Sequence, residues 1–283
     1  MSETTATDPN PSDFAPLVPR EGWHVLHLFY QIDHTQWSCY SDDEKRQAKV
    51  NLTELVGEIR TTPDTQLLLL AIASPKADLG FILLTPDLQT ANAFEKQLTL
   101  SLGPDILNPV YSYLSCTERS EYTPTREDHA AEVLIAGKGL VEGSPEFEAA
   151  LKEFDARIAH YTKFRLYPTL PDWPVICFYP MSKRRSGADN WYSLPFKERR
   201  HLMEGHARVG RTYSGRILQM ITGSTGLDES EWGVTLLAKD TYDIKAIVYE
   251  MRYDEVSARY AEFGDFYIGM QLPLDVLFRR LCL

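Results

Sequence analysis

Apolar and polar residues recur along the chain with two different periods, which separate strands from helices. Short runs of branched and aromatic residues predict strands, and apolar residues spaced three and four apart predict amphipathic helices. In the first half the predicted order is strand, helix, strand, strand, helix and strand. These elements span residues 24–32, 42–60, 66–74, 79–84, 87–102 and 110–116.

The second half repeats this order, with a broken helical stretch in the place of its second helix. Its elements span residues 175–180, 194–213, 217–222, 232–238, 242–262 and 266–272. A repeated order of elements predicts a duplicated fold. We therefore expect an α+β protein of two ferredoxin-like halves, whose antiparallel sheets form a β-barrel with outer helices, a dimeric α+β barrel.

Composition marks the boundaries of these halves. Residues 1–20 are polar and rich in proline, which predicts a mobile tail. The N-terminal half then occupies residues 21–116 and the C-terminal, ligand-binding half residues 173–283. Residues 117–172 are polar and acidic, with a helical pattern around 145–161, and we interpret them as a linker with a flexible loop.

Length and composition exclude several classes of protein. A chain of 283 residues with 43% hydrophobic and 24% charged residues is neither disordered nor collagen-like. Its four cysteines form no Cys-x-x-Cys pair, which excludes a zinc knuckle and a thioredoxin-like dithiol. No apolar run is long enough to span a membrane, and the first residues lack a secretory signal. We expect a soluble cytoplasmic protein with no membrane partner.

One segment departs from the acidic character of the chain, whose net charge of -11 argues against a nucleic-acid partner. Residues 181–216 contain nine lysines and arginines against three acidic residues, an excess of +6. A basic segment in an acidic protein favours a pocket for a small anion. A solvated face or a subunit contact explains the charge equally well.

The predicted helix 194–213 carries His206 on its apolar face, together with Leu202 and Val209. An imidazole in this position is either a hydrogen-bonded core residue or a ligand. The adjacent Gly205 favours a ligand, because glycine inside a helix costs about 1 kcal/mol relative to alanine.

The segment 177–185 ends a predicted strand. Period-two alternation places Cys177, Tyr179, Met181 and Lys183 on one wall, so that a phenol and an ammonium group lie side by side. The alternative is a strand end followed by a basic loop.

Three further polar residues have ordinary structural alternatives. Gln219 lies in an otherwise apolar strand and needs a polar neighbour or a ligand cavity. Arg165 is flanked by aromatic residues, and its alternative is an ordinary surface arginine. Ser257 follows Asp254, which is placed to cap a helical turn.

Several motifs of the second half occur together, and as a set they resemble one family. They are Tyr179-Pro-Met-Ser-Lys-Arg-Arg185, Asn190-Trp-Tyr192, Leu202-Met-Glu-Gly-His206, Gly210-Arg-Thr-Tyr213, Ile221-Thr-Gly-Ser224, Gly226-Leu-Asp-Glu229, Glu231-Trp-Gly-Val-Thr235 and Tyr249-Glu-Met-Arg-Tyr-Asp-Glu255. This set resembles the chlorite dismutase-like haem proteins and, among them, the coproheme decarboxylases. The resemblance is dense over residues 165–269, whereas in the first half only the order of elements agrees.

The resemblance implies a haem site in the C-terminal half and assigns roles to its residues. His206 matches the proximal ligand of the iron, and Tyr179 matches the redox-active tyrosine. Lys183, which we count with Tyr179 as catalytic, lies near the propionates of the bound iron porphyrin. Gln219 occupies the distal position. The cofactor-binding set is completed by Arg165, Met181 and Ser257.

The implied reaction is the peroxide-dependent oxidative decarboxylation of iron coproporphyrin III (coproheme). Two propionates become vinyl groups, which gives haem b through a tyrosyl radical at Tyr179. Gln219 stands where true chlorite dismutases carry arginine, which argues against chlorite chemistry. A glutamine is also no proton acceptor near neutral pH, which predicts poor general peroxidase turnover.

Two alternatives stay open, namely a chlorite dismutase or haem peroxidase, and a haem carrier or sensor without enzymatic activity. The resemblance also implies a homopentamer, hydrogen peroxide as co-substrate and transient contact with a coproporphyrin ferrochelatase. The sequence decides neither which propionate reacts first nor whether the linker closes over the pocket.

Overall fold

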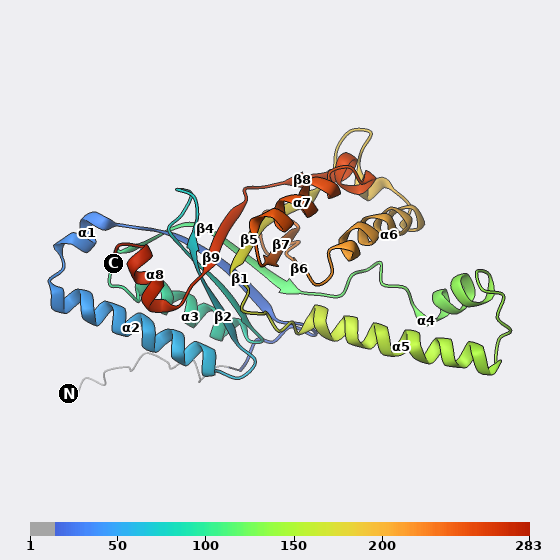
Figure 1. Cartoon of the computed structure of the whole chain (residues 1–283), viewed down its shortest axis with the longest axis horizontal. Coiled ribbons are helices and arrows are strands. Elements are labelled where there is room, and N and C mark those ends of the chain that lie inside the picture. The colour runs from blue at the N-terminus through green and yellow to red at the C-terminus, as the bar shows by residue number, and fades with distance from the viewer. Residues whose placement is uncertain (1–14) are drawn as a thin grey trace, which may run out of the picture.

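The structure is a computed structural model that describes residues 15–283. Figure 1 shows two groups of helices and strands that share one sheet, with a helical arm, drawn in green, on the side away from the marked C-terminus. The N-terminal half consists of β1 (His24–Ile32), α1 (His34–Cys39), α2 (Asp42–Thr61), β2 (Gln66–Ile72), β3 (Leu79–Thr85), α3 (Leu88–Leu100) and β4 (Leu107–Thr117).

The C-terminal half follows the predicted order with additional short elements. The stretch 242–262 divides into a helix, a π-helical turn and a short strand, and a last helix was not predicted. The elements are β5 (Val175–Lys183), η3 (Trp191–Ser193), α6 (Phe196–Thr212), β6 (Ile217–Gly223), β7 (Trp232–Ala238), α7 (Thr241–Met251), η4 (Val256–Tyr260), β8 (Ala261–Phe263), β9 (Tyr267–Gln271) and α8 (Leu274–Arg280).

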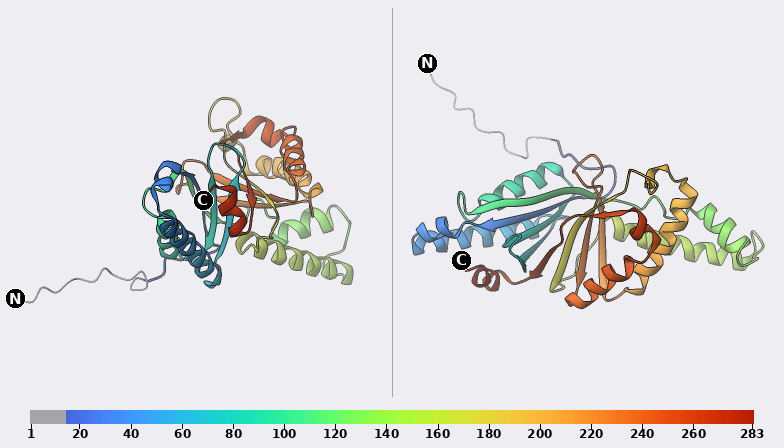
Figure 2. Two further views of the ribbon diagram at one scale, coloured as in Figure 1. Left: turned by 60° about the vertical axis from the view of Figure 1, so that its left-hand side comes forward. Right: turned by 90° about the horizontal axis from the view of Figure 1, so that it is seen from above.

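All strands of the sheet pair antiparallel, in the order β7-β6-β4-β1-β3-β2-β9-β5-β8. The first strand of this order, β7, also pairs with β5 near the other end of the order. Within the halves the orders are β4-β1-β3-β2 and β9-β5-β7-β6. Helices α2 and α3 lie over the strands of the first half, and α6 and α7 lie over those of the second (Figure 2). The predicted α+β class with antiparallel strands is confirmed.

Helix α2 illustrates how the sequence produces these layers. Ser41 begins the helix with a capping box, in which its hydroxyl accepts from the Glu44 N–H and the Glu44 carboxylate accepts from the Ser41 N–H. The apolar stripe of the helix is buried in the core of the N-terminal half. This burial fixes the face that α2 turns toward the strands.

The linker forms the arm, which contains α4 (Arg126–Asp128), η2 (His129–Ile135) and α5 (Pro145–Leu166). The arm has a small apolar cluster of its own around Leu134 and Phe147. It is joined to α6 by ion pairs from Arg200 to Asp128 and Glu132. The predicted helix 145–161 is confirmed and extends further toward β5.

Part of the predicted tail, residues 1–14, lies outside the described residues. The following stretch runs beside the start of α3, where the Leu17 N–H donates to Asp87 Oδ1 over 2.7 Å. Within residues 15–283, no helix has both the length and the apolar character needed to cross a membrane.

Candidate functional site

Tyr179 lies on the face of β5 that looks toward α6 and α7. It packs there with Cys177, Met181 and Leu236 in one apolar cluster, which confirms the shared face predicted for Cys177, Tyr179 and Met181. The Tyr179 side chain is only 6% exposed. Burial raises its pKa well above the ordinary value, a nearby Cys177 raises it further, and the charge of Arg252 opposes them. Tyr179 is therefore a neutral phenol near neutral pH.

Lys183 ends β5 as a buried cation, only 7% exposed. Its Nζ lies 4.9 Å from the centroid of the Trp191 ring. Burial lowers its pKa to about 8, and the carboxylates of Asp254 and Glu231 resist this change. Across residues 15–283 no salt bridge to the Lys183 ammonium is found. Lys183 is therefore a buried cation without an ion pair among the described residues.

His206 lies on α6 and is held by a carboxylate from the segment after α7. Its Nδ1 is 3.0 Å from Asp254 Oδ2. The other oxygen, Oδ1, accepts from the backbone N–H groups of Val256 and Ser257 over 2.9 and 3.3 Å. Burial raises the pKa of Asp254, but the hydrogen bonds from His206 and Ser257 outweigh it and lower the pKa overall.

The ionised Asp254 can only accept, which decides the tautomer of His206. Nδ1 carries the proton and donates it to Asp254, so Nε2 keeps its lone pair. An imidazole oriented in this way by a carboxylate is the usual form of a metal-ligating histidine. The arrangement makes His206 a competent ligand for one metal ion.

The substitution Asp254→Asn is expected to reverse this tautomer in the ligand-free protein. The amide oxygen should stay with the two backbone N–H groups, which turns the NH₂ group toward His206 and forces Nδ1 to accept. Ring ¹⁵N chemical shifts should then report a proton on Nε2 of His206, with the exposed His201 of the same helix unchanged. A His206 that keeps its proton on Nδ1 in this variant would contradict the assignment.

Gln219 and Ser257 lie close to the His206–Asp254 pair. The Gln219 Nε2 donates to the carbonyl of Gly210, one helical turn after His206, over 3.5 Å. A Cβ at Gly210 would lie 3.2 Å from that Nε2 and 3.3 Å from Met251 Cε, so glycine permits the close approach of helix and strand. The backbone N–H of Ser257 donates to Asp254 Oδ1, which confirms the predicted capping role of Asp254.

Arg165 contacts the end of β4, and through it the start of β7. Its Nε donates to the carbonyl of Glu118 over 3.2 Å at the end of α5, and the Glu118 carboxylate accepts from Trp232. None of the described contacts joins Arg165 to Tyr179, Lys183 or His206. The described contacts group His206 with Ser257 through Asp254, and Tyr179 with Met181 on one face of β5.

The basic segment 181–216 is largely neutralised by acidic residues from other elements. The arginines with ion pairs are Arg184, Arg185, Arg199, Arg200 and Arg216. These ion pairs take up five of the nine basic residues of the segment, and Lys183 is a buried cation without an ion pair in the described part of the chain. Except for Asp189, the acidic partners of these arginines lie outside the segment, so a count of charges along it does not reveal them.

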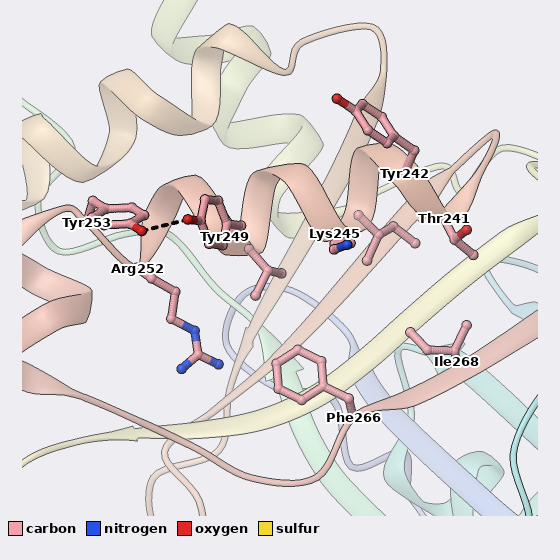
Figure 3. A pocket seen from close by; sticks show the side chains of 10 residues that line it. Thr241, Tyr242, Lys245, Tyr249, Arg252, Tyr253, Phe266 and Ile268 are labelled. Carbon is pink, nitrogen blue, oxygen red and sulfur yellow. Dashed lines mark hydrogen bonds between the residues drawn. The ribbon is translucent and has the colours of Figure 1, made fainter.

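The structure also contains a groove that the sequence did not predict, between α7 and β9 (Figure 3). Its volume is about 760 Å³. It is lined by Thr241, Tyr242, Ile244, Lys245, Val248, Tyr249, Arg252, Tyr253, Phe266 and Ile268. None of the predicted site residues lines it, but Phe266 touches Tyr179 from the groove side, with ring centroids 4.4 Å apart.

Comparison with known proteins places this geometry in a family. The family model described as chlorite dismutase matches residues 45–272. The chain belongs to the chlorite dismutase family. The structure resembles a heme-binding protein from Thermus thermophilus, with 37% sequence identity over 95% of this chain and 99% of that chain and a TM-score of 0.77. The family-level resemblance found in the sequence is confirmed.

A second similar structure is the chlorite dismutase from Candidatus Nitrospira defluvii in complex with imidazole. It shares 17% sequence identity over 94% of this chain and 97% of that chain, with a TM-score of 0.68. At this identity the likeness shows a common fold. It extends over both halves of the chain.

Proposed function

We propose that the protein catalyses the peroxide-dependent oxidative decarboxylation of coproheme to haem b. The observation that carries this proposal is that Asp254 orients His206 and lies near the ammonium of Lys183, which ends the strand that carries Tyr179. His206 offers Nε2 as a metal ligand, Lys183 offers a buried cation, and Tyr179 offers a neutral phenol on the same strand as Lys183. The heme-binding relative from Thermus thermophilus supports a haem ligand for this family member.

The residues present fit an iron porphyrin. Helix α6 has an amphipathic sequence, yet none of its residues is fully buried, so its apolar face is only partly covered. No other part of the described chain comes within 4 Å of the position that a Cβ would take at Gly205, next to His206. When bound through His206, the iron would activate hydrogen peroxide. Met181 and Gln219 would contact the ring from the sheet.

In this proposal Lys183 binds the propionate and Tyr179 oxidises it. The ammonium of Lys183 would bind the carboxylate, strengthened by the low dielectric of a buried site. A tyrosyl radical at Tyr179 would then remove hydrogen from the propionate β-carbon. For each propionate, one peroxide and one proton are consumed, and one vinyl group, one carbon dioxide and two waters are formed.

Gln219 and the remaining propionate-binding residues complete the proposal. A glutamine neither removes a proton from peroxide nor supplies the cation found at this position in true chlorite dismutases. We therefore expect slow peroxide activation and no oxygen release from chlorite. Ser257 would meet a propionate, and Arg165 would have to exchange its bond to Glu118 for one to the ligand.

The affinity for coproheme is expected to fall as the pH rises through about 8, the pKa to which burial lowers Lys183. Below this pH the ammonium is charged and attracts the propionate, and above it affinity should fall by up to about tenfold per pH unit. Lys183→Met should bind more weakly at pH 7 and show no such fall. Lys239→Met, which alters an exposed lysine, should keep the wild-type profile. A wild-type affinity that is flat from pH 7 to 9.5 would contradict this role.

The test of the proposed function is an anaerobic titration with coproheme, followed by stepwise addition of peroxide and mass analysis of the porphyrin. Two successive losses of a propionate, each giving a vinyl group, are expected. An unchanged or bleached porphyrin would favour a carrier or sensor. Oxygen release on addition of chlorite would favour a chlorite dismutase.

The finer features of the fold belong to the same proposal. The shared strand order of the halves and the pairing of β5 with both β9 and β7 support a duplicated ferredoxin-like fold closed into a barrel. Assembly into a homopentamer and transient contact with a ferrochelatase that delivers coproheme are proposed from the sequence resemblance. Native mass spectrometry would test the pentamer.

A further inference from the structure

Tyr179 lies at a gap in the pairing along one edge of β5, whereas on the other edge it pairs with Val234 of β7. Residues 175–178 of β5 pair with β9, and residues 181–183 pair with β8. Between these two ladders, Tyr179 and Pro180 face the turn 264–266 that connects β8 to β9. The turn is held in place at Gly264, whose N–H donates to the Pro180 carbonyl over 2.9 Å. A Cβ at Gly264 would lie 2.7 Å from Pro180 Cγ, so only glycine permits this close contact.

The two ends of this turn place phenylalanine rings on Tyr179. The Phe266 ring stacks on it with centroids 4.4 Å apart and an interplanar angle of 25°. The Phe263 ring lies at 5.7 Å in a tilted arrangement, and the Arg252 guanidinium covers Phe263 at 4.7 Å. The two rings therefore enclose one side of the phenol.

Phe266 also points into the groove between α7 and β9 (Figure 3). Phe266 lines the groove, whereas Tyr179 does not. The groove has an apolar floor and large aromatic residues at its rim, including Tyr249 and Tyr253, which are 62% and 73% exposed. Such a lining suits small aromatic molecules, among them phenols.

We propose that Phe266, braced by Phe263, determines the specificity of the radical chemistry by keeping phenols in the groove away from Tyr179. This inference rests on the proposed function. If a phenol reached a tyrosyl radical at position 179, hydrogen-atom transfer from its O–H would restore the tyrosine and leave a phenoxyl radical. The oxidising equivalent of the peroxide would then be diverted from the propionate to a solute. Phe266 acts as a positioning and shielding residue and takes no part in bond changes.

The shield is tested first in the ligand-free protein, by nitration with tetranitromethane and peptide mapping. Tyr249 and Tyr253 serve as exposed internal references. Phe266→Ala should raise the nitration rate of Tyr179 at least about tenfold, whereas Phe266→Leu, which keeps most of the bulk, should raise it much less. Ile268→Ala, which removes another apolar side chain from the same groove, should leave it unchanged. Equal nitration of Tyr179 in the wild type and in Phe266→Ala would overturn the proposal.

The specificity role is tested in the coproheme complex with peroxide and guaiacol, a small phenol. Phe266→Ala should oxidise guaiacol at least about tenfold faster than the wild type, and the double variant Phe266→Ala/Tyr179→Phe should lose this gain. A gain that persists in the double variant, or no gain at all, would overturn the specificity role. Failure of the wild type to form vinyl groups would refute the proposed function alone, because nitration measures the shield without any ligand.

Discussion

Replacement of Tyr179 by phenylalanine is expected to leave coproheme bound but almost unconverted when peroxide is added. Phenylalanine has no hydroxyl hydrogen to lose, so it forms no radical of the same kind and abstracts no hydrogen from the propionate. The rate of vinyl formation should fall at least about 100-fold, equivalent to about 2.7 kcal/mol in the barrier. Mass analysis of the porphyrin after stepwise peroxide addition measures this fall directly.

The fold should tolerate this change, since only one hydroxyl is removed. The ring at position 179 would still stack on Phe266 and pack with Cys177, and loss of a single hydrogen-bonding group costs about 1 kcal/mol. Tyr267→Phe is the matched control, because Tyr267 is buried on the neighbouring strand in another cluster. Full conversion to haem b by Tyr179→Phe would refute the radical role of this residue.

The sequence predicted the elements of the site more reliably than their partners. Alternation along 177–183 placed Tyr179 and Met181 on one face because side chains of a strand point to alternate sides. The period of α6 placed His206 on its apolar face for a similar local reason. Both inferences depend on residues that are neighbours in sequence, so they needed no knowledge of tertiary contacts.

The contacts that tune the site come from distant segments. Asp254 lies 48 residues after His206, and its local sequence predicted only a helix cap. Asp254 fulfils both roles because its two oxygens face different partners. Asp254 belongs to the motif 249–255, which was part of the family resemblance. The spacing of this motif does not show which side chain the Asp254 carboxylate contacts.

Phe266 was missed for a related reason. It belonged to the last predicted strand, whereas the structure places it in a turn between β8 and β9. The interruption of the β5 ladder beside Tyr179 depends on the pairing of three strands, and no local pattern of residues predicts such pairing. Likewise, the arginines of segment 181–216 gave a net charge, but their acidic partners on the arm and on α7 became visible only in the fold.

Replacement of His206 by alanine is expected to abolish the histidine-ligated spectrum of the coproheme complex. Alanine offers no lone pair to the iron, and no other histidine is near enough on α6, because His201 lies on the exposed part of the helix. Changes to groups that merely orient a ligand cost about 10- to 100-fold in metal affinity, so loss of the ligand itself should cost more.

The measurement is a coproheme titration followed by optical and resonance Raman spectra of the ferrous complex, in which an iron–histidine stretching band should be absent. His201→Ala makes the same chemical change on the same helix and should keep the band. Added imidazole should partly restore it in His206→Ala, because the variant leaves a space beside Asp254 where a free imidazole can donate to the carboxylate and bind the iron. An unchanged spectrum in His206→Ala would remove this residue as the ligand and, with it, the assignment of the haem to the face of α6.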